Sequence, residues 1–157
     1  MPNEPAAQRS LDLDRFVPYR LSVLTNRVSG AIARHYSDRF GLSIPEWRVM
    51  AVLGDAQRLS AREVAQRTAM DKVRVSRAVA TLVRKKRVAS TDDPKDGRVT
   101  RLSLSARGRA IYDEIVPLAL HLEDVLLSAL DPAERRSFDA LLAKLARQAR
   151  LLAPQTE

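Results

Sequence analysis

Basic side chains are concentrated in the middle of this chain of 157 residues, and this clustering is the first pointer to its chemistry. The whole sequence has 27 Lys and Arg against 19 Asp and Glu, a formal net charge of +8. Residues 62–109 hold 14 of the basic and 5 of the acidic residues, so the rest of the chain is nearly neutral. A basic block on a neutral scaffold is typical of proteins that bind a polyanion, because neutralised phosphates release counterions. The alternative is a solvated helix face.

Two short amphipathic segments in this block have the spacing of a helix-turn-helix. Ser60 and Glu63 form a capping box for a helix over 60–68, and Asp71 can cap a second helix that ends near Arg87. Small or apolar residues occupy the fifth, ninth and fifteenth positions of the motif, where the ninth is more often Gly: Ala65, Ala69 and Val75. The alternative is an ordinary pair of packed helices.

The second of these helices has a basic face opposite its apolar face when residues are placed at 100° intervals. Arg forms two hydrogen bonds with guanine, Ser bonds several bases, and Val contacts the thymine methyl group, so this face suits the major groove of double-stranded DNA. Near the end of the helix, phosphate contact is the alternative to base reading. The predicted DNA-binding residues of the two helices are Ser60, Arg62, Lys72, Val73, Arg74, Ser76, Arg77, Arg84 and Lys86.

A β-hairpin is predicted directly after this helix pair. Two β-prone runs, 88–91 and 99–104, flank the turn-forming segment 92–97, so the motif becomes a winged helix-turn-helix. Asp96 and Arg98 lie at the tip, where Asp96 is expected to orient the Arg98 guanidinium for the minor groove. The alternative is a surface ion pair of little energetic value.

Long helices with apolar stripes flank the basic block. Apolar residues recur every three or four positions over 11–40, and two further helices are predicted after Ser105 and after Asp131. The predicted fold is therefore mainly α with a small β-hairpin wing. We expect an N-terminal arm at 1–10, a winged helix-turn-helix at 41–104, and a helical dimerisation region formed by 11–40 and 105–152, all in one compact domain.

Residues 59–108 resemble the DNA-binding core of the MarR family of bacterial transcriptional regulators, and the resemblance extends through about 11–152. Two positions depart from the family pattern: Arg87 stands where the family usually has the Gly that ends the recognition helix, and Gly97 where it often has Arg. The matching motifs are Asp93-Pro94, Asp96-x-Arg98, and Leu104-Ser105 followed by Gly108.

The resemblance implies a homodimer that binds a pseudo-palindromic operator, usually as a repressor, in the bacterial cytoplasm at the nucleoid. Members of the family commonly respond to small aromatic acids or phenolics, and some respond to coenzyme A thioesters, oxidants or zinc. This chain has no Cys and two His, which disfavours the last two classes. An architectural DNA-binding protein without an effector is the alternative function.

An effector site is predicted on the first helix, where an uncharged polar stripe runs beside arginines spaced by seven residues. An Arg there can pair with a carboxylate, so we expect an anionic aromatic ligand. The alternative is that the stripe makes dimer contacts, the apolar residues belong to the core and the arginines are solvated. The candidate residues are Ser22, Asn26, Arg27, Arg34, Trp47 and Met70.

Other function classes find little support in the sequence. No Gly-rich phosphate loop or Ser, His and Asp arrangement suggests an enzyme, and no cofactor or metal site is expected. Pro94 breaks the pattern of a calcium loop in the acidic turn. The absence of aromatic residues between Trp47 and Tyr112 disfavours RNA binding, and neither a signal peptide nor a membrane span is predicted.

Overall fold

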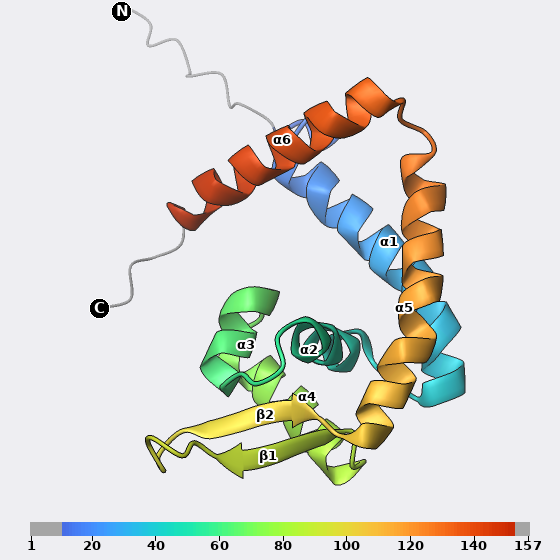
Figure 1. The fold of residues 1–157 in the computed structure, drawn as a ribbon. Helices are drawn as coiled ribbons and strands as arrows, with labels where there is room; N and C mark the ends of the chain where they lie inside the picture. The colour runs from blue at the N-terminus through green and yellow to red at the C-terminus, as the bar shows by residue number, and fades with distance from the viewer. Residues whose placement is uncertain (1–10, 153–157) are drawn as a thin grey trace, which may run out of the picture. The chain divides into compact units, whose positions relative to one another are not determined.

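The computed structural model describes residues 11–152, and the predicted arm at 1–10 lies outside this range. Its six helices and two strands confirm a mainly α fold with a β-hairpin (Figure 1). Unit one is described over 11–115 and unit two over 116–152. The elements are α1 (Val17–Phe40), α2 (Ile44–Asp55), α3 (Ala61–Thr68), α4 (Lys72–Arg84), β1 (Val88–Asp92), β2 (Thr100–Leu104), α5 (Ala106–Leu127) and α6 (Pro132–Arg150).

The first helix is shorter than the apolar pattern of 11–40 suggested. It begins at Val17, with a proline in its first turn, while the residues just before it form a turn in which the Phe16 N–H bonds the Asp12 carbonyl at 2.9 Å. Proline favours a helix start because it lacks a backbone N–H, and the N–H groups of the first helical turn have no partner within the helix in any case. Gly41 ends the helix in a left-handed conformation with φ 58°, which favours glycine at this position.

Side-chain caps set the starts of α2, α3 and α4. Ser43 and Glu46 form a reciprocal capping box at α2, and Ser60 and Glu63 form another at α3. The Asp71 carboxylate accepts the Arg74 N–H at 2.7 Å and caps α4. Each cap satisfies N–H groups that have no helical partner and contributes about 1 kcal/mol to helix stability. The predicted caps at Ser60 and Asp71 are therefore confirmed.

Helix α2 lies at the centre of the first unit, where α3, α4 and strand β2 contact it (Figure 1). Its Val49 and Leu53 side chains are fully buried, as are Val64 of α3 and Leu82 of α4. The two strands pair antiparallel with Val88 opposite Leu104, and Leu59 forms an additional bridge to Leu102. This bridge attaches the hairpin to the segment that leads into α3.

The recognition helix α4 ends earlier than predicted. Its last residue is Arg84, and Lys86, rather than Arg87, takes the left-handed conformation with φ 55°. The Arg87 N–H bonds the Leu82 carbonyl at 2.8 Å and the Lys86 N–H bonds the Val83 carbonyl at 2.9 Å. This is the Schellman pattern of a helix end, and it shows that the sequence interpretation placed the glycine-type position one residue too late.

Arg87 instead enters the protein interior with only 8% of its surface exposed. Its guanidinium donates to the Phe40 carbonyl at the end of α1, while Nε and Nη1 have no partner in the described chain. Burial lowers the pKa of Arg87, and Arg107 lowers it further.

The second unit contains the later part of α5, which runs unbroken through Pro117, and α6. Asp131 and Glu134 form the predicted capping box of α6, and no residue of α6 is buried. None of the helices within 11–152 is long and apolar enough to cross a membrane. The large apolar side chains exposed in this unit are Leu120, Val125, Leu126, Phe138, Leu141, Leu142, Leu145, Leu151 and Leu152.

Gly108 allows α5 to pass close to the end of the recognition helix. A Cβ atom added at Gly108 would lie 1.9 Å from the Arg87 carbonyl oxygen, so the backbone would have to move. We expect Gly108→Ala to lower the free energy of unfolding by about 1–3 kcal/mol in urea titrations. Gly30→Ala is the matched control, because nothing lies within 4 Å of the added atom. It should raise stability by about 0.5–1 kcal/mol, and equal effects of the two changes would contradict this packing.

Candidate nucleic-acid interface

Helix α4 separates an apolar inner face from a polar outer face. Val75, Ala78 and Leu82 are buried against the core. Val79 is partly buried against the same core, whereas the opposite face of the helix is exposed, and even the apolar Val73 there is 60% exposed. All of the predicted contact residues of this helix and its C-terminal turn are exposed: Lys72, Val73, Arg74, Ser76, Arg77, Arg84 and Lys86.

The cations of this outer face differ in how free they are. Arg74 lies 3.9 Å from the Asp71 carboxylate that caps its own helix. Arg77, Arg84 and Lys72 form no ion pair within residues 11–152. Their charges are therefore available to an external anion.

Ser60 and Arg62, the two residues at the start of α3 that are predicted to bind DNA, have different surroundings. Arg62 is exposed, whereas the Ser60 hydroxyl is engaged with Glu63, to which it donates at 2.7 Å. Between α3 and α4, Ala69 adopts a left-handed conformation with φ 52°. This conformation explains why Gly is common at the ninth position of the motif, and it sets the turn between the two helices.

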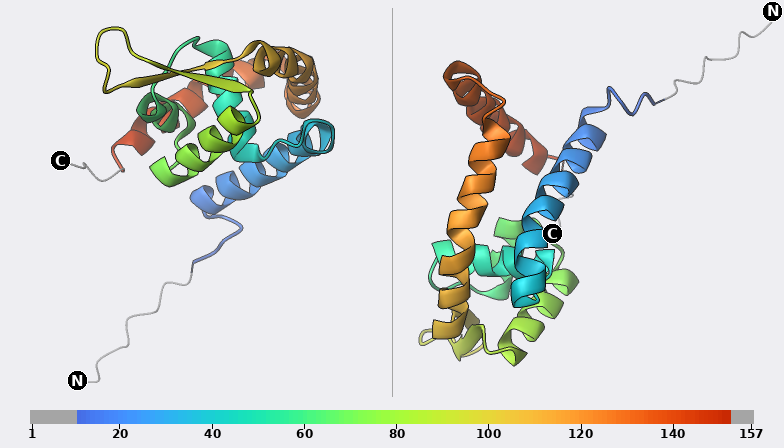
Figure 2. Two further views of the ribbon diagram at one scale, coloured as in Figure 1. Left: turned by 90° about the horizontal axis from the view of Figure 1, so that it is seen from below. Right: turned by 90° about the vertical axis from the view of Figure 1, so that its right-hand side faces the viewer.

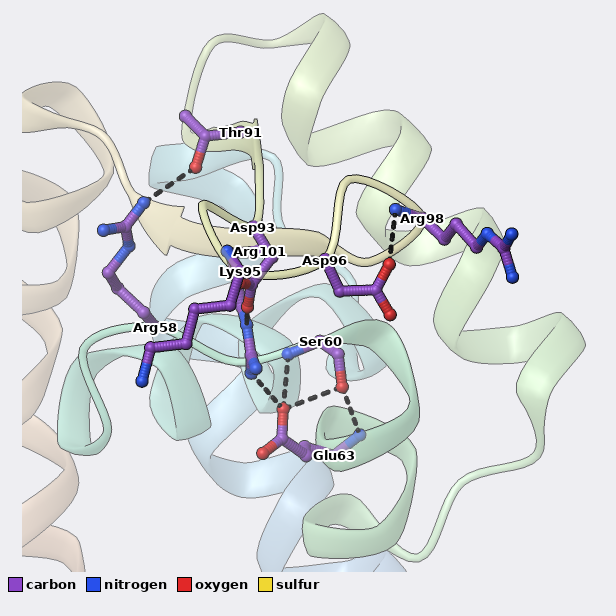
Figure 3. Close-up of polar contacts among 9 residues, drawn as sticks. All are labelled: Arg58, Ser60, Glu63, Thr91, Asp93, Lys95, Asp96, Arg98 and Arg101. Carbon is purple, nitrogen blue, oxygen red and sulfur yellow. Dashed lines mark hydrogen bonds and ion pairs between the residues drawn. The ribbon is translucent and has the colours of Figure 1, made fainter.

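The tip of the hairpin projects beyond α3 and α4 (Figure 2). Asp96 does not orient the Arg98 guanidinium, contrary to the sequence prediction. Its carboxylate accepts the Arg98 backbone N–H at 3.0 Å, and the Arg98 side chain extends away from it (Figure 3). A short Asp side chain bonds a backbone N–H two residues on more readily than a distant guanidinium, because that bond closes a local turn. The Arg98 guanidinium is left exposed.

The departure at Gly97 has a limited structural effect. Gly97 is exposed, its backbone is not left-handed, and an added Cβ would meet nothing within 4 Å. A side chain would fit at this position, so Gly97 changes the charge of the wing rather than its conformation.

The structure also reveals a three-residue ion cluster that the sequence interpretation missed. Arg101 donates through Nε to Asp93 at 2.5 Å and through Nη1 to Glu63 at 2.8 Å (Figure 3). Sequence reasoning assigned Glu63 to a capping box and counted Arg101 only within the basic block. No spacing rule could have found it, because Glu63 lies on α3, 38 residues before Arg101 in the chain.

This cluster shifts the pKa values of all three members. Hydrogen bonds from the Ser60 N–H and hydroxyl lower the pKa of Glu63, and Arg101 lowers it further. The hydrogen bond from Arg101, followed by the one from the Lys95 N–H, lowers the pKa of Asp93. Asp93 in turn raises the pKa of Arg101. Both carboxylates are thus held in the ionised form and share the positive charge of Arg101.

A hollow of about 400 Å³ lies between the start of α2 and the outer face of α4. Its wall combines arginine side chains with apolar ones and two helix N-caps. The lining residues are Ser43, Pro45, Glu46, Asp71, Val73, Arg74, Arg77, Ala78 and Thr81.

The predicted effector residues do not form one pocket. Trp47 stacks in the core, with its ring centroid 5.6 Å from that of Tyr36 and 5.9 Å from that of Tyr112. Met70 is only 7% exposed and belongs to the same core. Ser22, Asn26, Arg27 and Arg34 are exposed on α1.

A second hollow, of about 390 Å³, lies along the first turns of α1, and Arg27 is the one predicted effector residue in its wall. Two cations and several apolar side chains meet there. It is lined by Leu13, Asp14, Tyr19, Arg20, Val23, Leu24 and Arg27.

Arg48 is a further polar residue that the sequence interpretation did not single out. It lies on α2 and donates to the Ser29 hydroxyl of α1 at 3.4 Å. Nearby, burial raises the pKa of Tyr36 to about 12 although the Arg48 charge lowers it. A single sequence gives no sign of this contact, because residues 29 and 48 lie on different helices.

Comparison with known proteins agrees with this geometry. Residues 40–99 match a family model described as the MarR family. A MarR/EmrR family transcriptional regulator from Acinetobacter sp. ADP1 has a TM-score of 0.82 and 27% identity, with 90% of this chain and 99% of that chain covered. No curated protein matches the chain significantly.

Two further solved structures are similar to the chain. BpsR from Bordetella bronchiseptica, whose DNA binding is regulated by 6-hydroxynicotinic acid, has a TM-score of 0.72 and 29% identity, covering 83% of this chain and 98% of that chain. A mutant MarR from E. coli in complex with operator DNA has a TM-score of 0.72 and 22% identity, covering 87% and 99%, and shares the fold.

The ion cluster leads to a prediction about acid stability. Because the pKa of Glu63 is lower in the folded than in the unfolded protein, its contribution to the free energy of unfolding is complete above its unfolded pKa of about 4. That contribution disappears as the pH falls through the folded pKa. When the pH is lowered from about 6 to about 3, the Tm of Glu63→Gln should therefore fall by less than the Tm of the wild type.

Asp92→Asn is the control for this measurement. Asp92 is exposed on β1 and takes no part in the ion pairs of the described chain, so its variant should follow the wild-type curve. A Glu63→Gln curve parallel to the wild type would show that the cluster does not contribute to acid sensitivity.

Proposed function

The chain belongs to the MarR family of winged helix-turn-helix transcriptional regulators, and we propose that it is a repressor released from its operator by a small ligand. It binds a pseudo-palindromic operator as a homodimer, at the nucleoid in the bacterial cytoplasm. The ligand is a small anionic aromatic compound, such as an aromatic acid or a phenolic, or its coenzyme A thioester. The observation that carries the DNA-binding role is the row of exposed, unpaired cations on α4 beside the free Arg98 of the wing.

Helix α4 reads the major groove in this proposal. Arg77 forms a bidentate pair with a guanine, Ser76 bonds a base edge, and the exposed Val73 meets a thymine methyl group. The remaining cations hold phosphates and set the register without reading sequence. These phosphate-binding residues are Lys72, Arg74, Arg84 and Lys86, together with Arg62 at the start of α3, whereas the Ser60 hydroxyl stays bonded to Glu63.

The wing reads the minor groove through Arg98. Its backbone N–H is fixed by Asp96, while its guanidinium has no partner within residues 11–152. An arginine inserted into a narrow minor groove meets an enhanced negative potential. Replacement of Arg98 therefore lowers affinity and reduces the preference for narrow-groove sequences.

Dimerisation uses the regions 11–40 and 105–152. Helix α6 buries none of its residues, yet Phe138, Leu141, Leu142 and Leu145 are all at least 41% exposed. Apolar surface of this extent favours burial against a second copy. A two-fold dimer presents its recognition helices to successive major grooves about 34 Å apart.

The effector site is proposed at the hollow along α1. Arg27 and Arg20 supply positive charge beside Val23 and Leu24, a combination that suits an aromatic carboxylate. Regulation of BpsR by 6-hydroxynicotinic acid, an aromatic acid, supports this ligand class. Ser22, Asn26 and Arg34, which are exposed on the same helix, extend the site along α1.

A two-stage binding experiment tests the repressor proposal. Duplexes are first selected from a random library by the wild-type protein. Fluorescence anisotropy then compares the affinity for the selected duplex with that for a scrambled duplex at about 150 mM salt. Aromatic acids and their coenzyme A thioesters are then added. Selective binding that one compound releases is expected. Equal binding to both duplexes that no compound alters would favour an architectural DNA-binding protein.

Arg77→Ala tests base reading by α4. It should weaken binding to the selected duplex by about 1–3 kcal/mol and relax preference at one base position. Arg84→Ala, on the same helix, is the matched control. It should weaken binding to every duplex alike and reduce the salt slope by about 1. If Arg77→Ala also weakens all duplexes equally, Arg77 holds a phosphate and reads no base.

A further inference from the structure

We propose that Arg101 is a positioning residue for the wing, which sets where Arg98 enters the minor groove by joining the wing turn to α3. Arg101 does this by binding Asp93, at the start of the turn, and Glu63, in the first turn of α3. The inference rests on the proposed DNA-binding function and assigns a role to a residue outside the predicted contact set.

The geometry of the cluster is that of a clamp between two elements. Arg101 uses different nitrogen atoms for its two partners, Nε for Asp93 at 2.5 Å and Nη1 for Glu63 at 2.8 Å (Figure 3). The Asp93 and Arg101 side chains are 12% and 30% exposed, so the pair is partly shielded from solvent. Charge-assisted hydrogen bonds that are shielded in this way hold geometry better than open surface pairs.

The wing turn is braced internally, so it moves as one body. The Asp93 N–H bonds the Val99 carbonyl at 2.8 Å, and the Val99 N–H bonds the Asp96 carbonyl at 2.9 Å. The carboxylates of Asp93 and Asp96 accept the N–H groups of Lys95 and Arg98 at 2.8 and 3.0 Å. Arg98 is therefore fixed relative to Asp93, and whatever holds Asp93 holds Arg98.

Two side-chain hydrogen bonds within residues 11–152 join the hairpin to residues 58–63, at and just before the start of α3. One is Arg101 to Glu63, and the other is Arg58 to the Thr91 hydroxyl at 3.0 Å. Only the first joins opposite charges, and it alone is part buried. Glu63 is itself locked, because the same oxygen accepts the Ser60 N–H and hydroxyl at 2.7 Å each. The clamp thus transmits the position of α3 to the wing.

Asp93→Asn separates positioning from simple electrostatics. Removing a carboxylate from the basic block raises its net charge, which by itself tightens binding to DNA. In the variant, however, an amide nitrogen can face the Arg101 Nε donor and break the clamp. We expect about tenfold weaker binding to the selected duplex, the loss of one well-placed contact.

Asp92→Asn is the matched control, since it makes the same charge change one residue away and leaves the clamp intact. It should bind as tightly as the wild type or more tightly. If Asp93→Asn also binds as tightly as Asp92→Asn, the positioning role is wrong.

Arg101→Lys distinguishes positioning from direct phosphate contact. Lysine keeps the charge but cannot donate to two carboxylates through a fixed planar fork. Positioning predicts that Arg101→Lys binds as weakly as Arg101→Met, whereas a phosphate contact would be largely restored by lysine. A double-mutant cycle with Arg98→Ala adds a second criterion. Arg101→Met should cost little once Arg98 is absent, and fully additive losses would overturn the proposal.

Amide hydrogen exchange gives a readout that does not depend on DNA. Exchange across residues 93–101 should accelerate in Asp93→Asn and stay unchanged in Asp92→Asn, while the α2 amides keep their protection. Unchanged exchange in both variants would overturn the clamp. If the wild type selects no duplex, the proposed function fails, whereas faster exchange in Asp93→Asn would still establish the clamp.

Discussion

Burial of the apolar face of α4 against α2 is the constraint on which the rest of the interface depends. Val75 and Leu82 are at most 1% exposed, and their burial fixes the rotation of the helix about its axis. Because side chains on a helix are spaced by 100°, the same packing turns Arg77 and Val73 outward. The exposed basic face is thus a direct consequence of the core, and a rotated helix would expose Val75 in its place.

Local rules account for most of the fold and for the outward face of α4. The caps at Ser43, Ser60 and Asp71 were predictable, because each depends on residues within one helical turn. Contacts between distant segments were not. The bonds of Arg101 to Glu63 and of Arg87 to Phe40 span 38 and 47 residues, and no spacing rule links such positions. The prediction for Asp96 was wrong because its carboxylate accepts the Arg98 backbone N–H and does not pair with the Arg98 guanidinium.

The arrangement of charge follows from these tertiary contacts rather than from composition. Glu63 and Asp93 lie within the basic block, and both of them bind Arg101 inside the protein. Asp71 is likewise engaged as the cap of α4. Glu63, Asp93 and Asp71 therefore serve structure, while cations such as Arg77 and Arg98 stay free. This pairing leaves the net charge of the block unchanged, but the unpaired cations are the charges that an external anion meets.

Backbone strain at both ends of α4 completes this picture. Ala69 precedes the helix with φ 52° and Lys86 follows it with φ 55°, in a region that costs non-glycine residues about 1 kcal/mol or more each. Lys86 is exposed and carries a positive charge. A glycine at this position would relieve the backbone strain, but it would also remove that charge. The Schellman bonds from Lys86 and Arg87 and the buried Arg87 side chain hold this strained turn in place. The turn thereby keeps a positive charge at the end of α4, where the proposed function places a phosphate-binding residue.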